Sequence, residues 1–443
     1  MDGMRPAFTK FKTGGKTYIR TYMQRLFITL QLYGENGLAN HAAACAYGFL
    51  LSMAPMLLLI AFFIFKTFEP SAGAIASLIG NIPFLNDMFD ASWLSSDFFS
   101  FNKPGISGII SVLSIIWAGR ILALSIQRGL KIIFPADKNR NPVTETLVTF
   151  VIEAAVLIFI LIAIVGSRTA LRFYKFIDFI PQVSLFHFFT SRAGSHLSTA
   201  FFLGVVSFFV YLFVPVIPPK KFSAFQGALF CTVSYYCTAL FLRIILDISR
   251  FNFLYGTLGN LIILLINVFF FFSFFFLGAQ LSFVIEFFDA LLFSKLRQTG
   301  FVPVKHPPGY GLLNKIFHPP QGNFSKYLRN FKKGETILSH GGSLGLSSGG
   351  DVFYLIEGEV EVFIVSAQGL HISTGVLKGG SFFGERGYLL SEDSTAVVKA
   401  KTDVSAFALP PSLFDAVLKH DAGLDRELIE HTSRRIKDKN DNA

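Results

Sequence analysis

The chain has 443 residues, of which 52% are hydrophobic and 15% are charged, and 54 are phenylalanine. Soluble domains carry about 25% charged residues, so this composition argues against a wholly water-soluble chain and indicates lipid-facing helices. The net charge is +10, and nearly all of the excess lies in residues 1–288. We therefore expect the basic residues to set membrane topology and to contact anionic lipid, not to bind nucleic acid.

Residues 1–41 are predicted to form a cytoplasmic basic arm that contains an amphipathic helix. The segment 17–33 places aromatic and aliphatic side chains on one helical face, with Arg20 and Arg25 off that stripe. The stripe consists of Tyr18, Tyr22, Leu26, Leu30 and Tyr33. A helix with this pattern is expected to lie in the membrane interface.

Residues 42–288 contain six apolar segments, each close to the ~20 residues that cross a bilayer core. They are 42–65, 105–126, 147–166, 199–217, 225–248 and 258–287. We predict an α-helical polytopic membrane bundle of about six transmembrane helices. Lys and Arg are concentrated in the N-terminal arm and in loops 127–146 and 218–224, so the positive-inside rule places both termini in the cytoplasm. The basic loop 167–198 disagrees with this topology.

The first span begins with small residues four positions apart, Ala44, Gly48 and Ser52, and then reaches Pro55. Small residues let helix backbones approach closely in lipid, where apolar burial gives no driving force. Pro55 should kink the span, which is tolerated where neighbours or water satisfy the freed carbonyl. Tight packing is one interpretation of this pattern, and a place on a translocation path is the other.

Several polar side chains fall within the predicted spans, where a central charge costs ~2.5–3.5 kcal/mol on insertion scales, and six are candidates for a functional role. They are Arg120, Glu153, Arg243, Asp247, Asn267 and Gln280. Arg120 and Glu153 lie at matching depths on neighbouring spans, so we expect them to pair. Arg243 and Asp247 either pair with each other at this spacing or extend toward the interface. The two amides are expected to form interhelical hydrogen bonds.

Short motifs in residues 20–288 resemble the YihY/BrkB family of bacterial inner-membrane proteins. They are Ala43–Tyr47 with Ser52–Pro55, Gly108–Arg120, Gln226–Ala228, Tyr255–Gly259 and Leu277–Leu281. The resemblance implies six transmembrane helices, cytoplasmic termini and a place in the bacterial inner membrane, and some members are linked to virulence. The family's last motif often has glutamate where this chain has Gln280.

The C-terminal part is predicted to be a soluble β domain, residues 326–443, joined by a Pro- and Gly-rich linker, residues 289–325. Short β-rich segments occur at 352–356, 360–365 and 395–400, and residues 411–437 have helical spacing. The pattern of strands and glycines, ending in Gly380–Glu385, resembles a cyclic-nucleotide-binding domain. The resemblance implies a β-roll closed by helices.

The same resemblance implies a ligand site, whose candidate residues are Phe383, Gly384, Glu385, Arg386, Ser394 and Thr395. Glu385 matches the glutamate that binds the ribose hydroxyl. The position of the phosphate-binding arginine falls on Ser394, which cannot supply the bidentate, charge-assisted contact. We therefore expect tight cyclic-nucleotide binding to be absent, unless Arg386 bends back to the phosphate. A different small cytoplasmic ligand, or a protein partner, is the alternative.

These features favour a membrane transporter or exporter of unknown substrate with a cytoplasmic regulatory domain. The alternative is a non-transporting envelope scaffold whose C-terminal domain binds a partner. Catalysis, a metal and a cofactor are not expected, because the nine histidines are scattered and the three cysteines lie in apolar stretches without ligand spacing. The residues therefore do not support the ribonuclease label that the family has carried.

Overall fold

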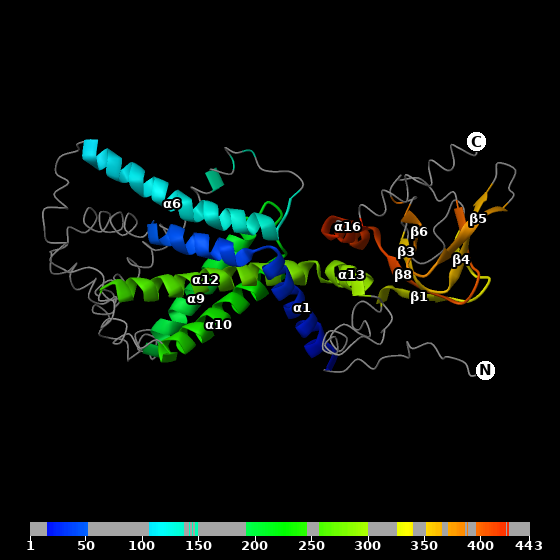
Figure 1. Cartoon of the computed structure of the whole chain (residues 1–443), viewed down its shortest axis with the longest axis horizontal. Coiled ribbons are helices and arrows are strands. Elements are labelled where there is room, and N and C mark those ends of the chain that lie inside the picture. Colours follow the sequence, from blue (N-terminus) through cyan, green and yellow to red (C-terminus); the bar gives the residue numbers. More distant parts are fainter. Residues whose placement is uncertain are drawn as a thin grey trace, which may run out of the picture. The chain divides into compact units, whose positions relative to one another are not determined.

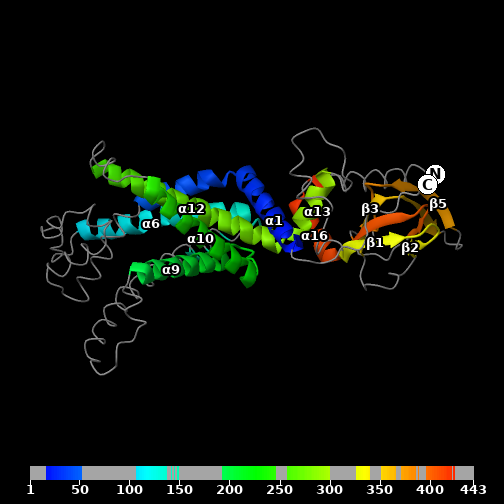
Figure 2. The ribbon, with the colours of Figure 1, turned by 90° about the horizontal axis from the view of Figure 1, so that it is seen from below.

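The computed structural model describes residues 16–51, 106–136, 192–245, 257–299, 326–339, 351–365, 371–385 and 396–421, with a few single positions besides. The chain divides into two compact units. One comprises residues 1–28 and 287–443, and the other comprises residues 29–286. The helices and strands of both units are shown in Figure 1 and, turned by 90°, in Figure 2.

The described residues of the unit 29–286 form helices joined by short turns. α1 (Lys16–Glu35) reaches into it and is followed, after the turn at Asn36 and Gly37, by a helix over Leu38–Leu51. The longer helices that follow are α6 (Ile106–Ile133), α9 (Arg192–Phe213), α10 (Lys221–Ile245) and α12 (Thr257–Glu286). α12 packs against α10 and α6, and α10 also packs against α9.

The second, fourth, fifth and sixth predicted spans coincide with α6, α9, α10 and α12. Most of the first span and nearly all of the third, 147–166, lie outside the described residues. Within the described part, two helices are long and apolar enough to cross a membrane, Lys221–Leu242 and Leu261–Glu286, and two shorter apolar helices cover Leu38–Leu51 and Ala200–Phe213. The six-span bundle and its orientation therefore remain predictions.

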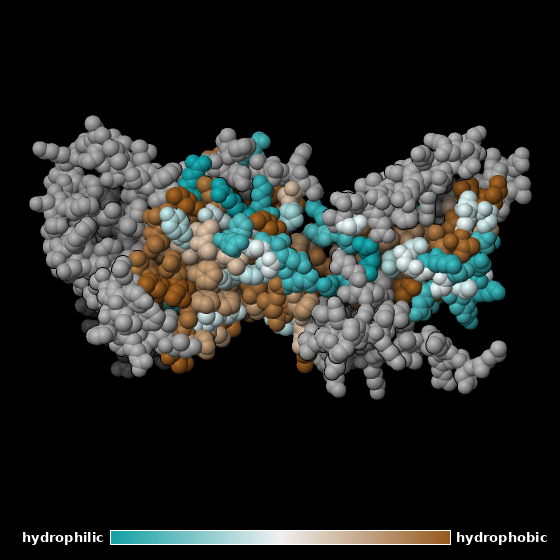
Figure 3. All heavy atoms as spheres, viewed as in Figure 1, coloured by the Kyte–Doolittle hydropathy of each residue, from teal (hydrophilic) through white to brown (hydrophobic). Residues whose placement is uncertain are grey.

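α10 shows what surroundings these helices require. Its large apolar side chains are exposed along one face: Phe222, Phe225, Leu229, Val233, Leu240 and Ile244. Its buried face carries small residues: Ser223, Ala224, Gly227, Ala228 and Cys231. Only 22% of its apolar window is buried, whereas a core helix of a soluble protein is mostly buried. Small residues inside and large apolar residues outside are typical of helices packed in lipid, and Figure 3 shows the apolar surface over α10 and α12 in brown.

The C-terminal domain consists of two four-stranded antiparallel sheets, as expected for a β-roll. The first has the order β1 (Leu328–Phe331), β8 (Val404–Leu409), β3 (Val352–Glu357) and β6 (Phe382–Phe383). The second has the order β2 (Thr336–Leu338), β7 (Ala396–Ala400), β4 (Glu359–Val365) and β5 (His371–Lys378). Both sheets contribute to one apolar core, which includes Phe353, Leu355, Phe383 and Val398. The three β segments predicted from the sequence are confirmed as β3, β4 and β7.

α16 (Pro411–His420) packs its apolar residues Leu413, Phe414 and Val417 inward. This confirms the first part of the helical spacing predicted for 411–437, of which residues 425–437 lie outside the described residues. The ring of Phe414 lies 6.1 Å from that of Phe382 in β6, measured between centroids. α16 therefore closes the end of the roll near β6.

The linker predicted for 289–325 is wrong in its first part, which forms α13 (Phe288–Thr299). α13 follows α12 after the single residue Phe287. Its buried residues are Phe288, Ala290, Leu291, Leu292, Phe293, Ser294 and Leu296. The ring of Phe293 meets those of Tyr354 and Phe407 at 5.4 and 6.4 Å between centroids. The Pro and Gly residues that indicated a linker all come after Thr299, outside the described residues, so they carried no information about α13.

Candidate functional sites

α10 and α12 cross at two glycines. A Cβ atom built on Gly227 would lie 2.3 Å from the carbonyl oxygen of Gly278, and one built on Gly278 would lie 2.5 Å from that of Gly227. The two backbones are therefore in direct contact. α9 joins the crossing through the fully buried Tyr211, whose hydroxyl donates a hydrogen bond to the Phe275 carbonyl at 2.6 Å.

A carboxylate ties the end of α12 to the beginning of α10. Glu286 accepts hydrogen bonds from the Ser223 hydroxyl at 2.9 Å and the Lys220 backbone N–H at 3.3 Å, and its side chain lies 2.9 Å from Lys220 Nζ. Because α10 begins at Lys221, this carboxylate lies where backbone N–H groups lack helical partners and the helix dipole is positive. The contact therefore holds the last residue of α12, which directly precedes Phe287, against the beginning of α10.

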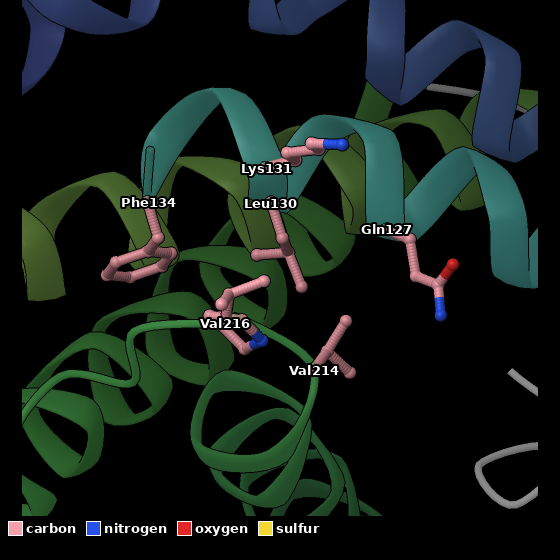
Figure 4. A pocket seen from close by; sticks show the side chains of 7 residues that line it. Gln127, Leu130, Lys131, Phe134, Val214 and Val216 are labelled. Carbon is pink, nitrogen blue, oxygen red and sulfur yellow. The ribbon is translucent and has the colours of Figure 1, made fainter. Parts of the chain in front are cut away.

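A small pocket lies where the C-terminal end of α6 meets the turn after α9. It is lined by Gln127, Leu130, Lys131, Phe134, Val214, Pro215 and Val216. Figure 4 shows Leu130 and Phe134 pointing toward Val216, whereas Lys131 extends along the helix. The cavity volume is about 30 Å³, room for about one water molecule. Pockets for small molecules measure about 300–1,000 Å³, so this pocket is too small for a substrate in this conformation.

In the C-terminal domain, the predicted ligand residues follow directly from β6. Phe383 stacks on Phe353, with the ring centroids 5.1 Å apart and the planes 7° from parallel. Gly384 has φ +84°, in the region that favours glycine, and a Cβ there would lie 3.2 Å from the Asp351 carbonyl oxygen. This turn buries the side chain of Glu385, which is 8% exposed. A buried carboxylate can accept hydrogen bonds from a polar ligand.

The segment after Glu385 is bonded to α16. The hydroxyl of Tyr388 donates a hydrogen bond to the carboxylate of Asp415, and its ring lies edge-on to Phe414 at 5.2 Å. Burial and this hydrogen bond raise the pKa of Tyr388 to about 12. Tyr388 therefore stays protonated at neutral pH and keeps its donor.

The C-terminal end of α16 is bonded to α13 by a buried cluster around Asp421, which is 6% exposed. Its carboxylate accepts hydrogen bonds from the Ser294 hydroxyl, from Arg297 Nη2 at 3.0 and 3.2 Å, and from the Leu424 backbone N–H at 3.1 Å. Burial alone would raise the pKa of Asp421, but the hydrogen bonds and the guanidinium outweigh it and lower the pKa overall. The carboxylate is therefore charged at neutral pH and holds the two helices together.

Residues 29–291, more than half of the chain, match the family model described as virulence factor BrkB. The chain belongs to the BrkB family. The matched region begins at residue 29, as the second compact unit does, so the BrkB region includes the end of α1, which the sequence assigned to the N-terminal arm. With its two apolar helices of spanning length, this BrkB protein is a membrane protein.

Residues 328–421 match the family model for cyclic nucleotide-binding domains. Among solved structures, the chain is similar to the catabolite activator protein of Thermus thermophilus, at 20% identity over 28% of this chain and 58% of that one, with a TM-score of 0.23. It is similar to an EAL enzyme in its cAMP-bound form, at 21% identity over 26% and 29%, with a TM-score of 0.20. A transcriptional regulator from Thermotoga maritima matches at 20% identity over 25% and 82%, with a TM-score of 0.22. The chain thus covers less than two thirds of the first two.

In this BrkB protein, the small residues predicted to line one face of the first span are separated. Gly48 is buried at α6, where a Cβ would lie 3.2 Å from Leu122 Cα. Ala44 is exposed, so its predicted place in the packing face is wrong. The buried face of this helix is centred on Ala42 and Cys45, and Ala44 falls beyond its edge. Two further predicted positions, Ser52 and Pro55, lie outside the described residues.

The two amides predicted to bond between helices behave differently. Gln280 is fully buried and accepts a hydrogen bond from Asn36, in the turn after α1, at 3.3 Å. Asn267 instead donates to the Ile263 carbonyl in its own helix at 2.8 Å, so its predicted interhelical bond is not formed within the described residues. A side-chain amide in a helix can donate to the backbone carbonyl one turn earlier, so its N–H is satisfied without a partner on another helix.

The predicted intramembrane charge pairs remain predictions. Arg120 is half-buried on α6, but Glu153 lies outside the described residues. Arg243 is described only as a backbone position in α10, and Asp247 lies outside the described residues, as do Arg386, Ser394 and Thr395. Sequence reasoning did not identify Glu286, Tyr388 or Asp421, because each acts through a partner far away in the sequence. No cluster of three or more potential metal ligands occurs within the residues that the structure describes.

Proposed function

We propose that this BrkB-family membrane protein is a transporter or exporter regulated by its C-terminal domain from the cytoplasm. The observation that supports this most directly is a series of contacts within residues 287–443 that leads from Tyr388, just after the candidate ligand residues, to α13. Tyr388 bonds to Asp415 on α16, and the end of α16 bonds through Asp421 to α13. Only Phe287 separates α13 from α12.

Such a series can transmit a change of state because the Asp421 cluster is buried and α13 is joined covalently to α12 through Phe287. Coupling between distant sites is carried by packed side chains and rigid elements that have two discrete arrangements. A ligand that shifts the segment after Gly384 would displace α16, and the Asp421 cluster would pass that displacement to α13. Since only Phe287 joins α13 to α12, we propose that the displacement acts on α12 through the chain itself.

The interior of the bundle supports transport over a purely anchoring role. Gln280 and Ser282 are 0% exposed, and each has a polar side-chain atom without a hydrogen-bond partner among the described residues. An unsatisfied buried polar group costs about 1–3 kcal/mol. Polar groups inside membrane helices commonly face water-filled cavities or substrate paths, and those that join packed helices are hydrogen-bonded across the interface.

The competing proposal is a non-transporting scaffold whose C-terminal domain binds a partner. The direct backbone contact at Gly227 and the one-water volume of the α6–α9 pocket favour it, because both describe a closed bundle. A transporter between cycles is also closed, so a flux measurement is required to distinguish the two. We propose no catalytic activity.

The test uses the full-length protein in proteoliposomes and a screen for uptake or release of candidate solutes. We expect wild type to move at least one solute, and Asp421→Asn to change its rate because the α13–α16 bond is weakened. The matched control is Glu357→Gln, an exposed carboxylate at the end of β3, which should leave the rate unchanged. Solute movement equal in wild type, Asp421→Asn and a chain lacking 326–443 would refute regulation, and no movement of any solute would favour the scaffold.

For the ligand, we propose a small cytoplasmic molecule at Phe383–Glu385 that is not a tightly bound cyclic nucleotide. Ser394 carries no charge for the phosphate. Losing one partner of a buried charged pair costs ~2–5 kcal/mol, on the order of 30- to several-thousand-fold in affinity. Calorimetry on the full-length protein with cyclic AMP and cyclic GMP should show no micromolar binding for wild type and a gain of affinity for Ser394→Arg. Micromolar binding to wild type would contradict the assignment.

A further inference from the structure

α1 exposes apolar side chains and buries polar ones, which is the reverse of a helix in a water-soluble protein. Four of its large apolar side chains are exposed: Ile19 by 66%, Tyr22 by 53%, Met23 by 50% and Leu30 by 52%. Two of its polar side chains are buried instead: Gln24 is 1% exposed and Thr29 is 0% exposed. An exposed apolar face of this kind requires an apolar neighbour, since water does not solvate it favourably.

The exposed residues form one surface. At 100° per residue, Ile19, Tyr22, Met23 and Leu30 fall within an arc of about 100° on the helix. Leu26, which is half-buried, lies in the middle of the same arc. Gln24 and Ile28 lie on the opposite side and are buried. We call the five residues 19, 22, 23, 26 and 30 the apolar stripe.

The helix cannot rotate to hide this stripe, because another of its sides is fixed. The guanidinium of Arg25 lies over the Phe288 ring at 4.8 Å from the centroid. Burial lowers the pKa of Arg25, and the neighbouring Asp289 partly offsets this. Asp289, in the first turn of α13, also accepts from Lys326 Nζ at 3.2 Å and from the Tyr327 hydroxyl at 3.1 Å. Arg25 thus holds α1 against the beginning of α13, which is itself bonded to the residues before β1.

We propose that the apolar stripe of α1 lies on a membrane surface rich in anionic lipid. The charge is complementary, because residues 1–41 contain six Lys or Arg against two acidic residues. The position is also suitable, since only Asn36 and Gly37 separate α1 from the apolar helix Leu38–Leu51 of the BrkB region. Amphipathic helices with basic residues bury their apolar face at the boundary of headgroups and acyl chains. The same helix then connects lipid, through its stripe, with the C-terminal domain, through Arg25.

Accessibility to quenchers tests the proposal on the full-length protein in nanodiscs. The background replaces Cys45, Cys231 and Cys237 with alanine or serine, and a nitroxide label is placed at Met23 or at Leu30. The control site is Ile372 on β5, an equally apolar residue that is 58% exposed. We expect molecular oxygen to collide with the labels at 23 and 30 more often than a water-soluble nickel chelate does, and the reverse at 372.

Charge is tested separately with nanodiscs of phosphatidylcholine alone or mixed with phosphatidylglycerol. Lys16→Glu should reduce the immersion of the label at 23 in the mixed discs, whereas Lys332→Glu, at an exposed position of the C-terminal domain, should not. A label at 23 and 30 as accessible to the chelate as that at 372 would overturn the proposal. Shielding from both quenchers would also overturn it, and spin–spin broadening would then identify a second copy as the occupant. If the label at 23 is equally immersed in Lys16→Glu and in wild type in the mixed discs, the part of the proposal that concerns anionic lipid is wrong.

Discussion

Substituting Gly227 by alanine should destabilise the helix bundle through one added methyl group. The Cβ would lie 2.3 Å from the Gly278 carbonyl oxygen, and ordinary contact begins near 3.4 Å. α10 and α12 would therefore separate by about 1 Å, and a gap of this size forfeits a quarter to a half of the attraction at the surrounding contacts. Overpacking costs roughly 1–3 kcal/mol, and the added helix propensity returns roughly 0.5–1 kcal/mol. The difference between these ranges predicts a net loss of up to about 2.5 kcal/mol, centred near 1 kcal/mol, in the free energy of unfolding.

The measurement is unfolding of the purified protein in mixed micelles by increasing SDS, followed by circular dichroism and by the fluorescence of its tryptophans. The matched control is Gly34→Ala in α1, where a new Cβ meets no atom within 4 Å. That variant should be unchanged or slightly more stable, because alanine is the better helix former. Equal midpoints for the two alanine variants would refute the direct backbone contact between α10 and α12.

Three other predictions concern Asp421, Glu286 and the membrane topology. Asp421→Asn should loosen α13 from α16 by about 3–5 kcal/mol, as expected when a buried ion pair loses one partner, and hydrogen exchange in α13 would report it. Because the pKa of Asp421 is lowered on folding, the stabilisation is complete above the unfolded value of about 3.9 and is lost as the pH falls below it, an acid dependence that the asparagine variant should lack. Glu286→Gln should cost roughly 1.5 kcal/mol, the lower end for a hydrogen bond to a charged group, measured in the same SDS unfolding, with exposed Glu357→Gln unaffected. For topology, a cysteine at position 340 in a cysteine-free background should label only after cells are permeabilised and one at position 90 from outside; the reverse pattern would contradict the predicted orientation.

The helices and strands that the sequence predicts best are those specified by local pattern. α12 coincides with a predicted span, 258–287, within one residue at each end, because its apolar run is long and contains no charge before Glu286. β3 and β4 follow from β-branched and aromatic runs on either side of Gly358, whose φ of +99° favours glycine at the turn between them. In both cases the neighbouring residues alone determine the element.

Contacts between distant residues were not accessible in the same way. Asp421 and Ser294 are 127 positions apart, and nothing in the sequence around Asp421 distinguishes it from other acidic residues of the C-terminal domain. α13 was missed because the residues after it, rich in Pro and Gly, determined the interpretation of the whole segment. Gly227 and Gly278 each lie in a predicted span, and a glycine within an apolar span is the signal that could have indicated the crossing.

α1 and α10 both expose a continuous apolar face, yet their buried faces differ, and this difference separates two places in a membrane. α10 buries small apolar and hydroxyl residues, including Ala224, Gly227 and Ala228, as helices that pack closely against one another in lipid do. α1 instead buries the polar side chain of Gln24, which is 1% exposed, and it carries the charged residues Arg20 and Arg25. Charged side chains at the centre of a bilayer are rare, whereas at its surface they remain in contact with water and phosphate. The composition of the remaining faces therefore distinguishes α10, which has the length and composition of a membrane-spanning helix, from α1, and it supports the proposal that α1 lies at the membrane surface.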